Sequence, residues 1–159
     1  MRCGEAKQML SEQDSNTIRR IQRAFSNVNF PPLSEIVHGN AWQDDEILDW
    51  LKERGAQVDD SFIEAFSDCL PNFTRAGIVY FLPRYMTYSI IHSNTRVMDY
   101  IVSKIANLAS SGCVLSDFSE EQRSAVRSFL VCAQHWYGLV GGPRYLEIIQ
   151  SQLSKGSVW

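Results

Sequence analysis

The chain has 159 residues, the length of one ordinary domain, and its 45% apolar and 21% charged residues exclude a disordered chain. A net charge of -3 without a basic stripe argues against a general nucleic-acid binder. The first residues are polar, and no long uncharged apolar run follows, so we expect a cytoplasmic protein with no signal peptide and no membrane span.

Helical periodicity accounts for the first half of the chain. Apolar residues at three- and four-residue spacings predict a first helix from Asn16, which Pro31 and Pro32 end, and residues 1–14 are expected to be a flexible N-terminus. A second helix is predicted from Asp44 to Arg54, and a third from Asp59 to Leu70. Both begin with acids, which suit the positive end of a helix dipole.

The most apolar segment is residues 73–91, which contain no carboxylate and a single proline. A helix that is apolar all round is buried on most sides, so this segment predicts a central element. Two alternatives remain for Pro83: it kinks the helix, or it stands in the first turn of a second helix that begins at Arg84.

Three further helices are predicted near the C-terminus. One follows Ser93 or Asn94, and another begins at the capping box of Ser119 and Gln122, in which each side chain satisfies a backbone N–H of the other residue. The glycine-rich residues 138–143 predict a hinge before a last helix over residues 145–153.

These patterns predict an all-α fold, a compact single-domain bundle of about seven or eight helices over residues 15–159. The apolar stripes of the longer helices give the expected core: Tyr80, Phe81, Leu82, Ile90, Met98, Ile101, Ile105, Val126, Phe129 and Leu130.

No catalytic or cofactor motif is present, and we expect no catalytic residue, cofactor or metal. Cys132 and His135 are three residues apart and could face one side of a helix, but zinc needs four ligands, or three and a water. The other histidines, His38 and His92, stand alone. The four cysteines form no C-x-x-C pair and are expected to be reduced thiols: Cys3, Cys69, Cys113 and Cys132.

Charge is distributed unevenly along the chain. Residues 44–68 contain nine acids against two bases, a net charge of -7. Two interpretations stay open: solvated outer faces of two amphipathic helices, or a docking surface for a basic partner protein. The docking hypothesis predicts the partner-binding residues Trp42, Asp44, Asp45, Glu46, Asp49, Trp50, Glu53, Asp59, Asp60 and Glu64.

A small basic cluster stands near the N-terminus: Arg19, Arg20 and Arg23. It is typical of a solvated helix face, with no exposed aromatics for base stacking.

Two tryptophans stand near the acids of residues 44–68. Trp42 and Trp50 are candidate aromatic anchors, because such side chains dominate interface energetics. Trp50 lies on the apolar stripe of its helix and fits a core position equally well. The adjacent pair Asp59 and Asp60 points in different directions from a helix start, which argues against acid–base work or Mg²⁺ binding.

Two motifs resemble a family of small uncharacterised bacterial proteins: residues 73–86 (FTRAGIVYFLPRYM) and residues 118–130 (FSEEQRSAVRSFL). That family pairs an aromatic-Leu-Pro-x-Tyr segment with a helix of the pattern Thr/Ser-x-x-Gln-Arg-x-Ala-Val-x-x-Phe-Leu. Its early amphipathic helix ending in Phe and its Trp-containing segment are similar to Ile18–Phe25 and Trp42. The resemblance covers about Ile18 to Trp136 and implies a helical fold, and it supplies no catalytic residues to carry over. By analogy, small acidic helical proteins of this kind look like immunity proteins, which bind and silence a toxin.

The sequence therefore predicts a non-enzymatic protein that binds another protein, as an immunity protein or antitoxin that occludes the basic active-site cleft of a cognate toxin. No nucleic acid or membrane is expected among its partners. The alternative is a small helical enzyme or ligand-binding domain, with a pocket near Tyr80, Tyr85, Tyr88 and His92.

Overall fold

A computed structural model of the chain describes residues 9–111, 118–140 and 147. Within these residues the regular structure is entirely helical, which confirms the predicted all-α class. The α-helices are α1 (Glu12–Ala24), α2 (Trp42–Arg54), α3 (Asp60–Ala65), α4 (Arg75–Ile91), α5 (Thr95–Ser111) and α6 (Glu120–Val140). Two short 3-10 turns join them: η1 (Leu33–Glu35) and η2 (Leu70–Asn72).

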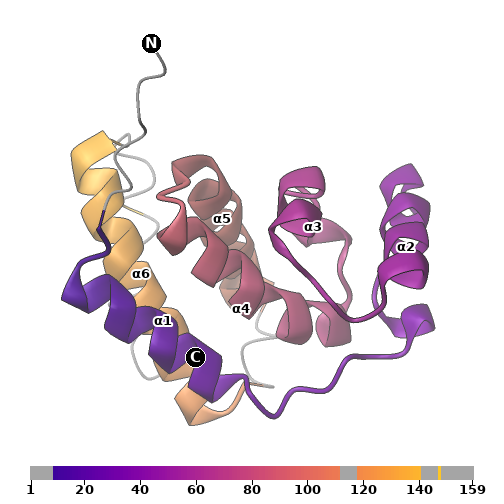
Figure 1. Ribbon diagram of the computed structural model, residues 1–159, viewed down its shortest axis with the longest axis horizontal. Coiled ribbons are helices and arrows are strands. Elements are labelled where there is room, and N and C mark those ends of the chain that lie inside the picture. The colour runs from indigo at the N-terminus through magenta and orange to yellow at the C-terminus, as the bar shows by residue number, and fades with distance from the viewer. Residues whose placement is uncertain (1–8, 112–117, 141–146, 148–159) are drawn as a thin grey trace.

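The helices follow one another along the long axis of the molecule (Figure 1). α1 and α6 pack side by side at one end, α4 and α5 pack together in the middle, and α3 contacts α4. α2 lies at the opposite end from α6. One face of α2 is buried through Ile47 and Leu51, so its other face forms an end surface of the molecule.

α4 decides between the two alternatives for Pro83, because one continuous helix runs through the proline. Proline lacks an N–H and leaves a carbonyl of the preceding turn without its helical donor. Polar side chains donate to carbonyls around it: Arg84 Nη1 to the Tyr80 oxygen at 2.7 Å, and Thr87 Oγ1 to the Pro83 oxygen at 3.1 Å. Burial of most of α4 then holds the helix in one piece.

The predicted seven or eight helices become six α-helices in the described residues. One difference is the unbroken α4. The second is that the predicted last helix, residues 145–153, lies outside the described residues except for residue 147, as do residues 141–143 of the predicted hinge. Contrary to the prediction, the helix is not interrupted at Gly138, since α6 continues to Val140.

Several helix boundaries also differ from the expectation, and α2 begins at Trp42 rather than Asp44. α1 begins at Glu12 rather than Asn16, because Ser11 caps it by accepting a hydrogen bond from the Asp14 N–H at 3.0 Å. Residues 12–14 are therefore helical and do not belong to a flexible terminus. α3 ends at Ala65 rather than Leu70. The carbonyl of the next residue, Phe66, accepts a hydrogen bond from the hydroxyl of Tyr85 at 2.6 Å.

Two predicted helix starts are confirmed by their hydrogen bonds. The Ser119 N–H donates to Gln122 Oε1 at 3.0 Å, and the Gln122 N–H donates to Ser119 Oγ at 3.1 Å, which completes the capping box. Asn94 Oδ1 accepts from the Val97 N–H at 3.1 Å and caps α5.

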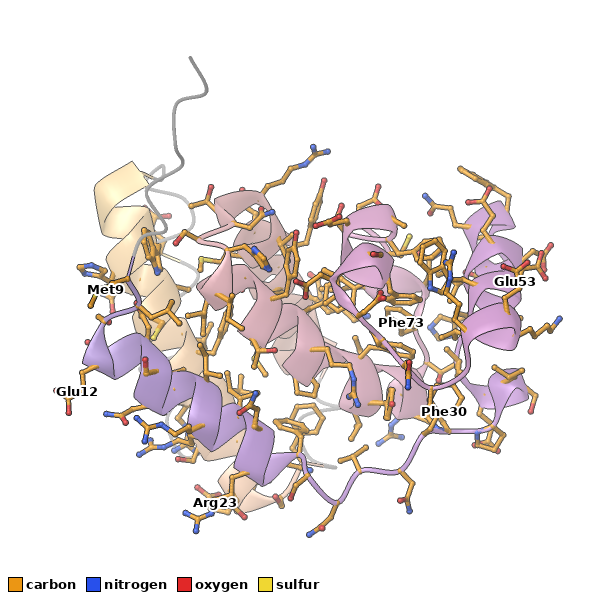
Figure 2. The ribbon with its side chains drawn as sticks, viewed as in Figure 1. Met9, Glu12, Arg23, Phe30, Glu53 and Phe73 are labelled. Atoms are coloured by element: carbon orange, nitrogen blue, oxygen red, sulfur yellow. The ribbon has the colours of Figure 1, made fainter. Side chains whose placement is uncertain are left out.

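All ten predicted core residues are buried. Aromatic side chains from three parts of the chain meet near the middle of the molecule, around Phe81 of α4. Its ring stacks on Phe73 with centroids 4.5 Å apart and on Phe62 of α3 at 5.3 Å. Figure 2 labels Phe73 between α2 and α4. These rings pack α3 and the segment before α4 against α4 itself.

Gly77 lies where the backbone of α4 approaches the loop after η1 most closely. A Cβ atom added to Gly77 would meet the Ile36 carbonyl oxygen at 2.3 Å and Phe73 Cβ at 3.1 Å. The same carbonyl accepts the Thr74 N–H at 2.9 Å, so it is held in place. This position therefore requires glycine for space, not for its backbone angles.

We expect Gly77→Ala to lower the free energy of unfolding by about 1–2 kcal/mol. A methyl group forced against a fixed carbonyl costs up to about 3 kcal/mol, and the higher helix propensity of alanine offsets about 1 kcal/mol of that cost. Urea unfolding measures the effect. Gly55→Ala is not a suitable control, because Gly55 has a positive φ of 68°; the exposed neighbour Ala76→Gly is suitable, with an expected loss near 1 kcal/mol. If the Gly77→Ala protein is as stable as the wild type, the loop that contains Ile36 moves to make room for the added methyl group.

Candidate functional site

Four of the predicted docking acids share the outer face of α2 with Trp42. Residues 42, 45, 46, 49 and 53 recur every three or four positions and therefore lie on one side of the helix. All five are exposed. We call this set the α2 stripe: Trp42, Asp45, Glu46, Asp49 and Glu53. Figure 2 labels Glu53, which lies on α2 at the end of the molecule.

The charges of the α2 stripe have few partners within the protein. In the described part of the chain the one ion pair they form joins Asp49 to Lys52, at 3.9 Å between oxygen and nitrogen. Both of those side chains are more than half exposed, and such a pair is worth little. The stripe is thus a row of exposed carboxylates that, within the described residues, only the weak pair with Lys52 compensates.

Trp42 is the most exposed aromatic residue for which the structure gives a value, with 71% of its surface accessible. It occupies the first position of α2 and continues the line of the acids. Tryptophan is enriched among the few residues that dominate the binding energy of protein interfaces. This placement agrees with the role of an aromatic anchor that the sequence suggests.

Asp44 is the main correction to the predicted docking set. It is only 1% exposed, on the inner face of α2. One carboxylate oxygen accepts the three consecutive backbone N–H groups of residues 39–41, at 2.8, 3.1 and 3.3 Å. The other accepts the side-chain amide of Asn72 at 2.8 Å. Asp44 therefore ties α2 to the preceding loop and to η2, and it is not available to a partner.

The acids of α3 differ from those of α2 because each has a partner within the molecule. Asp59 caps α3 by accepting the Phe62 N–H at 3.1 Å. Asp60 Oδ2 lies 2.9 Å from His92 Nε2. Glu64 accepts the hydroxyl of Tyr88 at 3.4 Å. These three residues are exposed, but Asp59 caps its own helix, and Asp60 and Glu64 contact residues in or next to α4. The predicted acidic surface therefore divides into a mostly free part on α2 and an engaged part around α3.

Trp50 lies between the core and the surface, as its two sequence interpretations allow. Its ring packs edge-on against Phe66 at 5.6 Å and Phe62 at 6.3 Å between centroids. On another side, the guanidinium carbon of Arg54 lies 3.6 Å from the centre of the Trp50 ring. The indole nitrogen is buried without a hydrogen-bond partner among the described residues.

A groove runs beside the α2 stripe. It has a volume of about 470 Å³, and both α2 and α3 contribute to it: Glu46, Asp49, Trp50, Glu53, Arg54, Ala65 and Phe66. Its lining combines carboxylates from the stripe with the aromatic rings of Trp50 and Phe66. Arg54 and Phe66 were not predicted as site residues, although the spacing of four between Trp50 and Arg54 is the signal that could have identified Arg54.

The tyrosines of the alternative pocket are mostly structural. Tyr80 and Tyr85 are buried, and their hydroxyls donate to backbone carbonyls, Tyr80 to Ala56 at 3.0 Å and Tyr85 to Phe66 at 2.6 Å. Burial raises the pKa of Tyr85 well above its ordinary value, so its hydroxyl stays protonated and keeps donating. These two tyrosines therefore stabilise the fold and do not line an open pocket.

Tyr88 and His92 lie together at the other end of that segment. Their ring centroids are 4.4 Å apart, and each contacts an acid of α3. Burial, followed by the nearby Glu64 carboxylate, raises the pKa of the Tyr88 hydroxyl, which keeps it a donor rather than a base. The arrangement joins α3 to α4, and it lacks the ordered chain of nucleophile, base and orienting group that covalent catalysis needs.

The structure does not bring Cys132 and His135 into one site. Cys132 is buried and its thiol donates to Thr17 Oγ1 of α1 at 3.2 Å, whereas His135 is exposed. Burial raises the pKa of Cys132 to about 11 and that of Cys69 to about 12, so both are thiols at neutral pH. Within the described residues, no three His, Cys, Asp or Glu side chains are grouped closely enough to hold a metal ion.

A second groove, of about 960 Å³, runs between α1 and α6 at the end of the molecule away from α2. Arg19, Arg20 and Arg23 line it, together with Glu120 and Glu121. Arg20 donates to Ser128 Oγ of α6 at 2.8 Å. The mixed charge of this groove is typical of a solvated helix face.

Comparison of the chain with protein-family models, with curated proteins and with solved structures finds no match. The resemblance to small bacterial helical proteins therefore stays a prediction. Among the described residues, no helix is long and apolar enough to cross a membrane.

Proposed function

We propose that this protein is a non-enzymatic binding protein whose α2 stripe docks on a basic cleft of a partner protein, and that it acts as an immunity protein or antitoxin. The observation that carries this proposal is the alignment of the exposed Trp42 with carboxylates that have almost no cations of their own within the described part of the chain. Such a face attracts a basic surface over long range and offers it an aromatic anchor on contact.

The position of α2 suits a mechanism of occlusion. α2 forms one end of the molecule, so a cleft can receive it without meeting the other helices (Figure 1). From residue 42 to residue 53 the stripe is about 16 Å long, at 1.5 Å per residue. A partner whose active site carries lysines or arginines would be covered along that length, and its substrate would be excluded.

The stripe alone is too small for a stable complex. A single helix face of this length presents a few hundred Å², whereas a standard interface buries about 800 Å² on each partner. The groove beside α2, with Trp50 and Phe66 in its lining, extends the available surface and adds apolar area to it. The proposed interface therefore includes both the stripe and the groove.

A protection assay tests the biological part of the proposal. The chain is co-expressed with the product of the adjacent gene, and the growth of the cells is measured. We expect the wild-type chain to restore growth and the variant Asp45→Lys/Asp49→Lys/Glu53→Lys to fail, because three reversed charges repel a basic cleft. The control variant, Glu12→Lys/Glu35→Lys/Glu121→Lys, reverses three exposed acids outside α2 and should still protect. Absence of toxicity from the neighbouring product, or equal protection by both variants, would contradict the immunity function.

A further inference from the structure

The groove between α2 and α3 already contains a cation of the protein itself. The guanidinium of Arg54 lies over the face of the Trp50 ring, at 3.6 Å from its centre. Arg54 is exposed, and none of the ion pairs in the described residues joins it to a carboxylate of the groove. The aromatic face is therefore what holds the guanidinium where it is.

The chemistry of the groove suits a guanidinium from outside as well. The faces of tryptophan attract cations, and arginine stacks on them with its flat group while still donating hydrogen bonds at its edge. Three carboxylates from α2 line the same groove and can accept such hydrogen bonds: Glu46 and Glu53, which form no ion pair in the described residues, and Asp49, which is weakly paired with Lys52. The groove is shallow and open to solvent, so a side chain of a partner can reach the Trp50 ring and the carboxylates beside it.

We propose that the groove is the binding site for an arginine side chain of the basic partner, and that Arg54 occupies the Trp50 face in the free protein and must be displaced. This inference rests on the proposed function for the existence of a basic partner. It adds the residue type that the partner contributes, the position where this residue binds, and a residue of the chain that limits the affinity.

Displacement makes a prediction opposite to that for an ordinary interface residue. Removing Arg54 should tighten the binding of an external arginine, because no internal guanidinium then has to leave the ring. Exposed contacts between a cation and an aromatic ring correspond to a change of about two- to fivefold in a binding constant. Simple removal of one positive charge also favours a cationic ligand, so a control for charge is needed.

Lys52 provides the matched control. It is an exposed cation on the same helix, two residues before Arg54, and its partner is Asp49 rather than the Trp50 ring. Lys52→Gln and Arg54→Gln thus remove the same charge from the same end of α2. Only Arg54→Gln also vacates the aromatic face.

The experiment titrates the peptide acetyl-Gly-Gly-Arg-Gly-Gly-amide into the full chain and follows the indole ¹⁵N–¹H resonance of Trp50, assigned with Trp50→Phe. We expect the dissociation constant to fall about two- to fivefold further in Arg54→Gln than in Lys52→Gln, and the peptide with citrulline in place of arginine to leave the resonance unmoved. Circular dichroism melting checks that both variants fold like the wild type.

Three results would overturn the inference: equal tightening by Lys52→Gln and Arg54→Gln, an equal response to the citrulline peptide, or no shift of the Trp50 resonance in any of the proteins. Since the titration needs no partner protein, these results would leave docking by the α2 stripe open to the protection assay. Conversely, a failed protection assay combined with tighter arginine binding in Arg54→Gln would support the groove as an arginine-binding site and reject the immunity function.

Discussion

Replacing Phe129 by alanine is expected to lower the free energy of unfolding by about 3–5 kcal/mol, the largest effect that we predict for a single substitution. Phe129 lies on α6 and is fully buried in the main hydrophobic core. Truncation removes the transfer free energy of the ring and leaves a cavity that the surrounding helices fill only in part. The measurement is urea unfolding, followed by circular dichroism.

Val131, two residues further along α6, supplies the control. It is 41% exposed, so Val131→Ala removes little buried surface, and alanine is the better helix former. We expect this variant to stay within about 0.5 kcal/mol of the wild type. A loss below about 1 kcal/mol for Phe129→Ala would mean that α6 does not pack in the core as described.

Asp44→Ala is expected to lower the free energy of unfolding by about 3 kcal/mol, although an aspartate in a helix rich in acids looks dispensable in the sequence. The substitution leaves three backbone N–H groups of residues 39–41 and the Asn72 amide without their acceptor. A fully buried donor without a partner costs about 1–3 kcal/mol, and because these four hydrogen bonds are only part-buried, water offsets much of the sum.

The neighbouring residue Asp45 is the control for Asp44, because it has the same side chain but is exposed. Asp45→Ala loses only a favourable charge in the first turn of α2, worth about 0.3–1 kcal/mol. Thermal and urea unfolding of the two variants side by side measure the difference. If the two losses are equal, the Asp44 network does not hold α2 in place, and its removal from the docking set would have to be reversed.

The features that the sequence predicted well depend on patterns among residues close together in the chain, or on amino-acid composition alone. The capping box of Ser119 and Gln122 involves residues three positions apart, and the structure shows its two hydrogen bonds. The burial of α4 follows from an apolar run that leaves no polar side. Both patterns are complete within one stretch of the chain, so no knowledge of the packing is needed.

The features that it missed depend on contacts between distant residues. α4 continues through Pro83 because packing on most sides of the helix outweighs the lost hydrogen bond, and α3 ends early where Tyr85 reaches the Phe66 carbonyl. Asp44 appears to be one more surface acid until its contact with Asn72, 28 residues away, is seen. Charge counting along the chain cannot separate such a buried carboxylate from its exposed neighbours.

The exposure of the outer face of α2 could be predicted from the sequence, whereas the contacts of individual acids could not, and the docking role of this face stays a prediction. The outward face of α2 follows from helical spacing, which places Asp45, Asp49 and Glu53 in one row. The engagement of the α3 acids does not follow from spacing, since Asp60 and Glu64 find their partners on α4, at His92 and Tyr88. The docking hypothesis therefore depends on α2 and on the groove beside it.

The most direct test of this account is the association rate of the chain with the product of the adjacent gene, at low and high ionic strength. For the wild type we expect a rate that falls as salt is added, because unpaired surface carboxylates act mainly on the encounter of the partners. For Asp45→Lys/Asp49→Lys/Glu53→Lys we expect slower association that no longer falls with salt, with folding nearly intact. Unchanged association rates of the variant at both salt concentrations would contradict the account and leave the α2 stripe as a solvated face.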